Sequence, residues 1–251
     1  MIKPLVPTAK PGGRPEDDPK REILNGLFSL LRRGWAWRML PQDLPPWRLV
    51  YDSLWTWRQD GIWPLIHDLL RGDGRAATGK RRQSSAAISD SQASKPRKKG
   101  LCGDDAGKQG KGRQRPLLVE TLGFVFAVVI TAAKGHDRDG AKRRLAAFRP
   151  RLSRVRHIWA EGAYSGPQVD GVKALRPQRP LRLAIPKRSE AAQGCEVIPK
   201  RGLVARAFGW FHRDRRLRQD DEHLPQTSAA AMSHGVLIQL MIRRFAPTSP
   251  S

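Results

Sequence analysis

The fold class is decided by the stretch PLLVETLGFVFAVVITAA, at residues 116–133. Its apolar residues form two short blocks, PLLVETL and FVFAVVITAA, with Gly123 between them. Apolar blocks rich in β-branched and aromatic residues and joined by a glycine turn are typical of a β-hairpin. The run is also too short and too interrupted, by Glu120 and Gly123, to span a membrane. A β-sheet is therefore predicted, and the other elements are interpreted around this hairpin.

The flanking sequence extends the sheet and covers it with helices. A short strand is predicted at Ala86–Ser89, before the hairpin. After the hairpin in the sequence, a helix capped by Asp139 is predicted. Alternating strands and helices follow it, in the segments VRHIWAEGAY, GPQVDGVKALR, LRLAIPKR, LVARAFGWFHRDRRL and Ala229–Phe245. Hairpin strands followed by strand–helix alternation indicate a mixed α/β (α+β) sheet with helices on its faces. An RNase H-like fold has this order of elements.

The N-terminal part of the chain is predicted to be helical. Apolar spacing predicts helices from Arg21 to Leu31, from Asp43 or Pro45 onward, and over residues 61–71. Residues 1–71 are interpreted as a helix-turn-helix-like DNA-binding domain, residues 72–83 as a linker, and residues 84–251 as the RNase H-like domain. The alternative for the Trp-rich helices is simple core packing. Residues 94–115 have almost no apolar content, so they are predicted to form a basic surface loop.

The composition indicates a polyanionic partner. The 251 residues include 47 Lys and Arg against 23 Asp and Glu, which gives a formal net charge of +24. Such a charge attracts nucleic acid, because neutralising phosphates releases counterions. A ribosomal-type or merely solvated basic surface is the alternative. Two separate cysteines, Cys102 and Cys195, argue against disulfides and zinc and fit a reducing cytoplasm. The N-terminus has no apolar segment typical of a secretory signal.

Six sequence blocks occur in the same order as in a known family, and six ordered matches argue against chance similarity. The blocks are WRMLPQDLPPW (37–47), ISDSQ (88–92), DAGKQGKGRQRPLLVETLG (105–123), DRDGAKRRL (137–145), IWAEGAYSG (158–166) and RAFGWFHRDRRL (206–217). The series resembles the DDE transposases of bacterial insertion sequences, in the insertion-sequence-five family. The resemblance implies DNA strand cleavage and transfer on double-stranded DNA, at element ends and at a target. It also implies a homodimer or higher assembly on DNA, and an N-terminus shorter than in relatives.

The resemblance implies a catalytic set of two Asp and one Glu that holds Mg²⁺ or Mn²⁺. The first Asp matches Asp90, in ISDSQ. The second falls on Glu161, which keeps the charge but is longer by one methylene. The Glu of the family motif V-E-R-x-F-x-W falls on Ala205, because this chain reads V-A-R-A-F-G-W. Glu196 and Glu222 are the nearest replacements in the sequence. The sequence therefore predicts Asp90 and Glu161 as catalytic and metal-binding residues of a degenerate site.

Basic residues in two segments are predicted to contact DNA. Lys and Arg contact phosphates and position a backbone without reading its sequence. The predicted residues are Lys108, Lys111, Arg113 and Arg115 in the first segment, and Arg206, Trp210, Arg213, Arg215 and Arg216 in the second. The alternatives are a solvated loop for the first segment and a solvated helix face over a core for the second.

Three functions are compatible with these patterns. The first is an active transposase, and the second is a catalytically inactive DNA-binding remnant of one. The third is an unrelated RNA-binding protein, against which the strand region Glu120–Ala133 counts, because it lacks the aromatic pattern of an RNA-recognition sheet. The family resemblance favours a transposase-type protein of the bacterial cytoplasm, associated with the nucleoid. The alanine at position 205 predicts little or no turnover.

Overall fold

The computed structural model describes residues 3–7, 19–94, 103–105, 110–128, 131–132, 148, 153–160, 181–185, 201–218 and 230–245. Within these ranges, the description leaves out the side chains of residues 3, 92–94, 103–105, 110–114, 131–132 and 201.

The N-terminal segment is helical, as the apolar spacing predicts. A short 3-10 helix η1 (Lys3–Leu5) is followed by α1 (Lys20–Arg33), a second 3-10 helix η2 (Trp37–Met39), α2 (Trp47–Gln59) and α3 (Ile62–Ala76). Helix α2 begins directly after Pro46, whose fixed φ suits a position just before a helix. Helix α3 continues five residues past the predicted end at 71. The first part of the predicted linker is therefore helical, because Gly72 and Gly74 pack in the interior of the molecule and do not end the helix.

The end of α1 depends on Gly34. Its φ is 75°, and its N–H donates to the carbonyl oxygen of Leu30 at 2.8 Å. A Cβ at this position would lie 3.0 Å from the Cβ of Arg215. We expect Gly34→Ala to lower the free energy of unfolding by about 1–2 kcal/mol through the left-handed conformation alone, and by more through this crowding. Urea denaturation measures the loss.

Gly61→Ala is the matched control for that substitution. Gly61 has a similar φ of 70°, but a Cβ there would meet nothing within 4 Å. The difference between the two losses therefore isolates the close approach of α1 to Arg215. Equal losses would mean that this approach contributes nothing to stability.

The sheet has the strand order of an RNase H-like fold. Its strands are β1 (Ala86–Ser94), β2 (Gly103–Asp105), β3 (Gly110–Glu120), β4 (Val125–Val128), β5 (Thr131–Ala132), β6 (His157–Ala160) and β7 (Arg182–Ala184). The main order is β2-β3-β1-β6-β7, and β4 and β5 also pair with β3. Strand β1 is antiparallel to β3 and parallel to β6, and β6 is parallel to β7. The predicted fold class is confirmed, and so is the hairpin, which turns at Gly123 with φ 84°.

The prediction of a surface loop over residues 94–115 is wrong in part. Strand β3 begins at Gly110, and Arg113 pairs with Ser94 of β1. Gly103–Asp105 forms β2, which pairs with Gly110–Gly112. Backbone hydrogen bonds hold these paired strands together whatever their side chains, so a search for apolar alternation does not detect them. The strand predicted at Ala86–Ser89 is too short, because β1 continues to Ser94 in the structure.

Three helices follow the sheet. They are α6 (Arg201–Arg213), α7 (Arg215–Arg218) and α8 (Ala230–Phe245). The helix predicted over LVARAFGWFHRDRRL is thus two helices that meet at Asp214. The strands predicted within VRHIWAEGAY and LRLAIPKR are confirmed as β6 and β7. The helices predicted after Asp139 and over GPQVDGVKALR lie outside the described residues.

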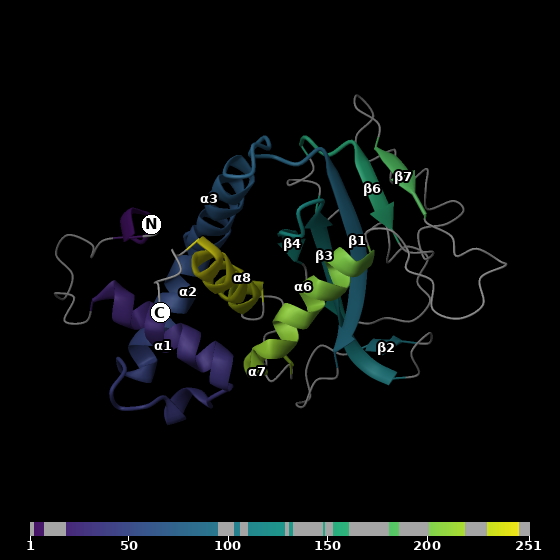
Figure 1. Cartoon of the computed structure of the whole chain (residues 1–251). Coiled ribbons are helices and arrows are strands. Elements are labelled where there is room, and N and C mark those ends of the chain that lie inside the picture. The colour runs from purple at the N-terminus through teal and green to yellow at the C-terminus, as the bar shows by residue number, and fades with distance from the viewer. Residues whose placement is uncertain are drawn as a thin grey trace, which may run out of the picture.

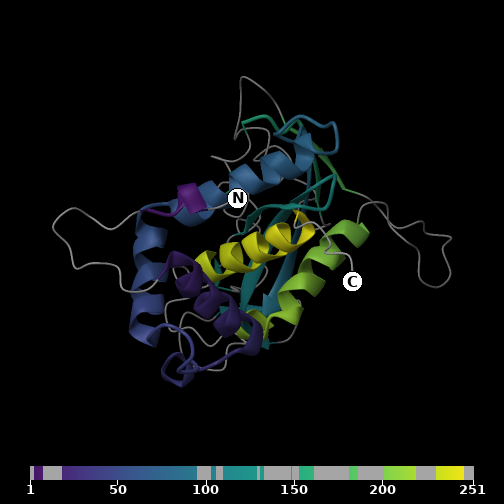
Figure 2. The same ribbon diagram turned by 60° about the vertical axis from the view of Figure 1, so that its left-hand side comes forward.

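Apolar side chains pack on both faces of the sheet. Ile88, Leu117 and Val119 share one hydrophobic cluster with the helices, whereas Ala87 and Leu118 belong to a second cluster with Phe148 and Ile158. Adjacent residues alternate between the faces, as the pleat requires. Helix α6 crosses the face of β1 and β3 (Figure 1), and α8 lies between the N-terminal helices and the sheet in both views (Figures 1 and 2). No helix in the described part of the chain is long and apolar enough to cross a membrane.

The helices and the sheet share the first of these clusters. It contains residues of α1, α2 and α3 together with residues of β1, β3, α6 and α8. Residues on either side of the predicted 72–83 linker therefore contribute to one continuous core.

Candidate functional site

Asp90 lies where the parallel pairing of β1 ends. Ser89 is the last residue of β1 paired with β6, opposite Ala160, whereas pairing with β3 continues through Asp90 and beyond. Asp90 is half-buried, and its carboxylate Oδ1 accepts a hydrogen bond of 2.7 Å from the Ser91 N–H. The strand predicted at Ala86–Ser89 places Asp90 just after its end. In the structure β1 continues to Ser94, so Asp90 lies within the strand. It still occupies the point where the two parallel strands part.

Asp90 and α6 are on the same side of the sheet. Strand alternation puts Asp90 on the face of Ile88, and Ile88 packs in the cluster that includes Val204 and Phe211 of α6. Ala205 follows Val204 on this helix and is exposed. The position that matches the family Glu is therefore on a helix that covers the face of the first carboxylate, and its side chain is a methyl group.

The described residues do not fit a two-metal site. Divalent ions such as Mg²⁺ prefer several carboxylate or other oxygen ligands. Of the three predicted positions, Asp90 supplies a carboxylate, Ala205 supplies no donor, and Glu161 lies outside the described residues. The two replacements considered, Glu196 and Glu222, also lie outside them. Among the residues that the structure describes, no three His, Cys, Asp or Glu side chains are grouped so that they could hold a metal ion.

The predicted DNA-contacting arginines of the C-terminal segment divide into exposed and buried ones. Arg206, Arg213 and Arg215 are exposed on α6 and α7. Arg216 is 9% exposed and donates from Nη1 to the carbonyl oxygen of Trp35 at 2.7 Å. Its guanidinium also stacks over Trp37. Arg216 therefore joins α7 to the N-terminal helices and does not face solvent.

Arg115, also predicted to contact DNA, lies inside the protein. It is only 2% exposed, donates from Nη2 to the carbonyl oxygen of Leu217 at 3.1 Å, and stacks over Phe211 at 5.4 Å. Its guanidinium thus links β3 to α7. Lys111 and Arg113 lie on β3, but their side chains are outside the description, and Lys108 lies outside the described residues altogether.

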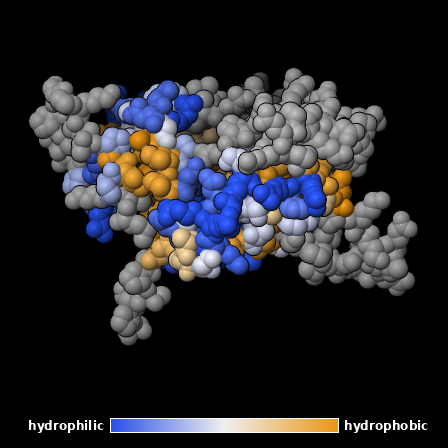
Figure 3. Space-filling model, turned by 90° about the horizontal axis from the view of Figure 1, so that it is seen from above, coloured by the Kyte–Doolittle hydropathy of each residue, from blue (hydrophilic) through white to orange (hydrophobic). Residues whose placement is uncertain are grey.

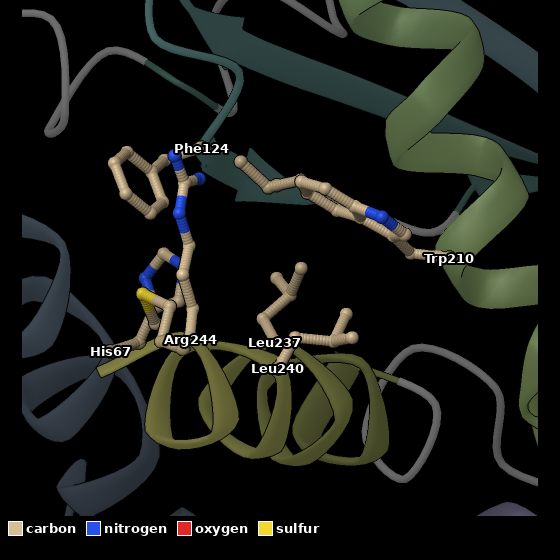
Figure 4. A pocket seen from close by; sticks show the side chains of 8 residues that line it. His67, Phe124, Trp210, Leu237, Leu240 and Arg244 are labelled. Carbon is tan, nitrogen blue, oxygen red and sulfur yellow. The ribbon is translucent and has the colours of Figure 1, made fainter. Parts of the chain in front are cut away.

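Trp210 lines a cavity between α6 and α8. The cavity has a volume of about 200 Å³, and Figure 4 shows the Trp210 ring facing Leu237 and Leu240, with Arg244 and His67 on the other side. The described residues that line it are mainly apolar, and none of them is a carboxylate. The Trp210 ring is half-buried and lines this cavity.

Sequence reasoning missed a buried ion cluster between α3 and β3. Glu120 is fully buried, and one carboxylate oxygen lies 2.7 Å from Arg75 Nη1 and 3.6 Å from Arg71 Nη1. Burial raises the pKa of the Glu120 carboxyl above its usual range, and the two guanidiniums only partly oppose this. A charged residue inside an apolar strand was the available signal.

The order of the strands in this mixed sheet and the helices packed on it define the class of the protein as RNase H-like. Within this class, the chain belongs to the DDE transposases: a family described as "Transposase DDE domain" matches residues 77–236. A second family, described as "Putative transposase of IS4/5 family", matches residues 1–67. The predicted family resemblance is thereby confirmed.

One relative agrees with the family matches. The "Insertion element IS402 uncharacterized 16.2 kDa protein" of Burkholderia cepacia is 34% identical over 89 residues, which cover 31% of this chain and 56% of the relative. The chain thus spans little more than half the length of this relative.

Proposed function

We propose that the chain is a transposition protein that binds double-stranded DNA, at element ends and at a target, but lacks a complete strand-cleavage site. The observation that carries the proposal is the methyl group of Ala205 on the helix that covers the face of Asp90. The transposase family supports DNA as the substrate, and the net charge of +24 supports binding to its backbone. The alternative is an active enzyme that uses Glu196 or Glu222 as its third carboxylate.

Divalent metals generally serve catalysis in the transposase family that the chain matches. In this chain, Asp90 and Glu161 are the residues proposed to retain contact with such an ion. A site that lacks one of its cooperating ligands loses most of its activity, because the groups act as a unit. DNA binding requires no such ion, so it is the function that survives the loss of the family Glu.

Exposed arginines on α6 and α7 are proposed to contact phosphates. Arg206 and Arg213 are seven residues apart, which places them on one face of α6, and Arg215 follows at the start of α7. Lys108, Lys111 and Arg113 are proposed to add contacts from the basic segment before the hairpin. Assembly on DNA as a homodimer or larger oligomer belongs to the same proposal.

The N-terminal helices are proposed to contribute a further DNA contact, within the predicted domain of residues 1–71. Arg38 and Arg48 stack over the Trp47 ring at 5.9 and 5.5 Å, and both are exposed. Arg58 stacks over Trp55 at 4.7 Å. Such stacking limits the rotation of each guanidinium, so less freedom is lost when it binds a phosphate.

We expect duplex binding to weaken steeply as salt rises, because each phosphate contact releases counterions. The double variant Arg206→Gln/Arg213→Gln should make the slope of log K against log salt shallower by about 2, or about 1 for each lost contact. Fluorescence anisotropy with a labelled duplex in EDTA measures this without metal chemistry.

The matched control for this experiment is Arg21→Gln/Arg243→Gln, which removes the same charge from two exposed positions on α1 and α8. It should keep the slope of the unmodified chain. Salt-independent binding, or no binding by the unmodified chain, would overturn the proposed function.

A further inference from the structure

Exposed cations gather at the edge of the sheet opposite Asp90. Strands β1, β6 and β7 are parallel, so all three begin at this edge, at the top of Figure 1. Arg156 directly precedes β6 and Arg182 is the first residue of β7, and both are exposed. The connection from α3 to β1 adds Lys80, Arg81 and Arg82, which are exposed as well. We call these five residues the upper basic edge.

Backbone hydrogen bonds hold the upper basic edge together. The N–H of Arg156 donates to the carbonyl oxygen of Ser85 at 2.7 Å, and the N–H of Arg182 donates to that of Arg156 at 2.8 Å. Neighbouring strands are about 4.8 Å apart, so the backbones of the two arginines are adjacent, with Arg182 paired opposite His157. Arg75 fixes the connection, since its Nε donates to the carbonyl oxygen of Arg81 at 2.7 Å.

Little acidic charge opposes this edge in the described part of the chain. Asp73 pairs with Arg82 at 2.6 Å, in an exposed ion pair. Behind the edge, Arg71 and Arg75 both approach the buried carboxylate of Glu120, and Arg71 also pairs with Asp68 at 3.7 Å. Among the described residues, Arg156 and Arg182 have no hydrogen-bond or ion-pair partner for their guanidiniums. Seen from above, hydrophilic residues gather in a band across this end of the molecule (Figure 3).

We propose that the upper basic edge binds the phosphate backbone of a second DNA segment, apart from DNA held at the Asp90 edge. This inference rests on the proposed function. Ala86 begins the parallel pairing of β1 with β6, and Asp90 follows its last pair, about 13 Å further along β1 at the rise of a strand. The upper basic edge and Asp90 therefore lie toward opposite ends of the parallel strands. Guanidinium groups donate paired hydrogen bonds to phosphate oxygens, and such contacts do not distinguish one DNA sequence from another.

The test compares two double variants of the full chain. Arg156→Gln/Arg182→Gln should reduce the slope of log K against log salt for a random-sequence duplex by about 2. It should weaken binding equally for all duplex sequences. Arg21→Gln/Arg243→Gln removes the same charge elsewhere and should leave the slope unchanged. Binding is measured by anisotropy in EDTA, and equal thermal melting of the variants confirms that both remain folded.

Each other outcome counts against the inference. If the unmodified chain binds duplex but Arg156→Gln/Arg182→Gln keeps its slope, the upper basic edge does not contact DNA, while the proposed function stands. An equal fall in the control variant would mean that only total charge matters. Tighter binding of an RNA hairpin than of duplex, lost in the double variant, would assign the edge to RNA. A chain that binds no duplex at all fails the proposed function first.

Discussion

Ala205→Glu is expected to create metal-dependent DNA strand cleavage that the unmodified chain lacks. The side chain at this position is exposed, so a glutamate costs no packing, and both residues favour a helix. The substitution returns a carboxylate to the helix that covers the face of Asp90. Because ligands of one site act as a unit, the gain should be large, roughly 10³-fold or more over background. Nicking of a duplex that carries the flanking element ends, with Mg²⁺ or Mn²⁺, measures it.

Two controls separate repair of the site from a general change in the helix. Ala205→Gln has nearly the same shape as the glutamate but no charge, and it should remain inactive. Asp90→Asn in the Ala205→Glu background should abolish the gained cleavage, because it removes the other carboxylate. Robust cleavage by the unmodified chain would show that the site is complete without position 205. Loss of that cleavage in Glu196→Gln or Glu222→Gln would then identify the replacement.

The sequence predicted the fold well where side-chain pattern and backbone pairing agree. Two apolar blocks with Gly123 between them predict the hairpin, and the structure pairs Leu117–Val119 with Val125–Val128 around a turn at Gly123. Residues 110–115 continue the same strand with polar and glycine residues. Their ladder with β1 depends on backbone groups alone, and no apolar pattern records it.

The basic residues were harder to interpret, because charge does not report burial. Arg115 and Arg216 carry the same charge as the exposed Arg213 and Arg215, yet they donate hydrogen bonds to backbone carbonyls inside the protein. Long arginine stems can cover apolar rings while the guanidinium binds a distant carbonyl. Those partners are about 102 and 181 residues away in sequence, so only the folded chain reveals them.

Asp90 and Ala205 illustrate the opposite case. The ordered motif blocks predict a role for both positions, although neither residue is unusual by itself. The structure adds that strand pleat and helix packing bring both positions to one side of the sheet.

Glu120→Ala is expected to destabilise the fold by about 3–5 kcal/mol, because removing one partner of a buried ion pair leaves the other charge uncompensated. Here the guanidinium of Arg75, only 7% exposed, would lose the carboxylate that it contacts at 2.7 Å. Urea denaturation measures the loss. The matched control is Asp73→Ala, which breaks an ion pair of 2.6 Å with Arg82 whose partners are both about half exposed. That pair should be worth less than about 1 kcal/mol, because solvent screens it.

The pH dependence tests the electrostatic part of this argument with Glu120→Gln, which keeps the shape and an acceptor oxygen but does not ionise. Burial raises the pKa of Glu120 in the folded protein above its value in the unfolded chain. The folded state therefore favours the protonated carboxyl. The stability that the protonated Glu120 carboxyl adds is fully present below the ordinary pKa of a glutamate. It is lost as the pH rises through the raised pKa of the folded protein. The stability of the wild type relative to Glu120→Gln should accordingly fall as the pH rises through this window. A relative stability that rises instead would mean that Arg71 and Arg75 outweigh burial, and that the ionised cluster itself fastens α3 to the sheet.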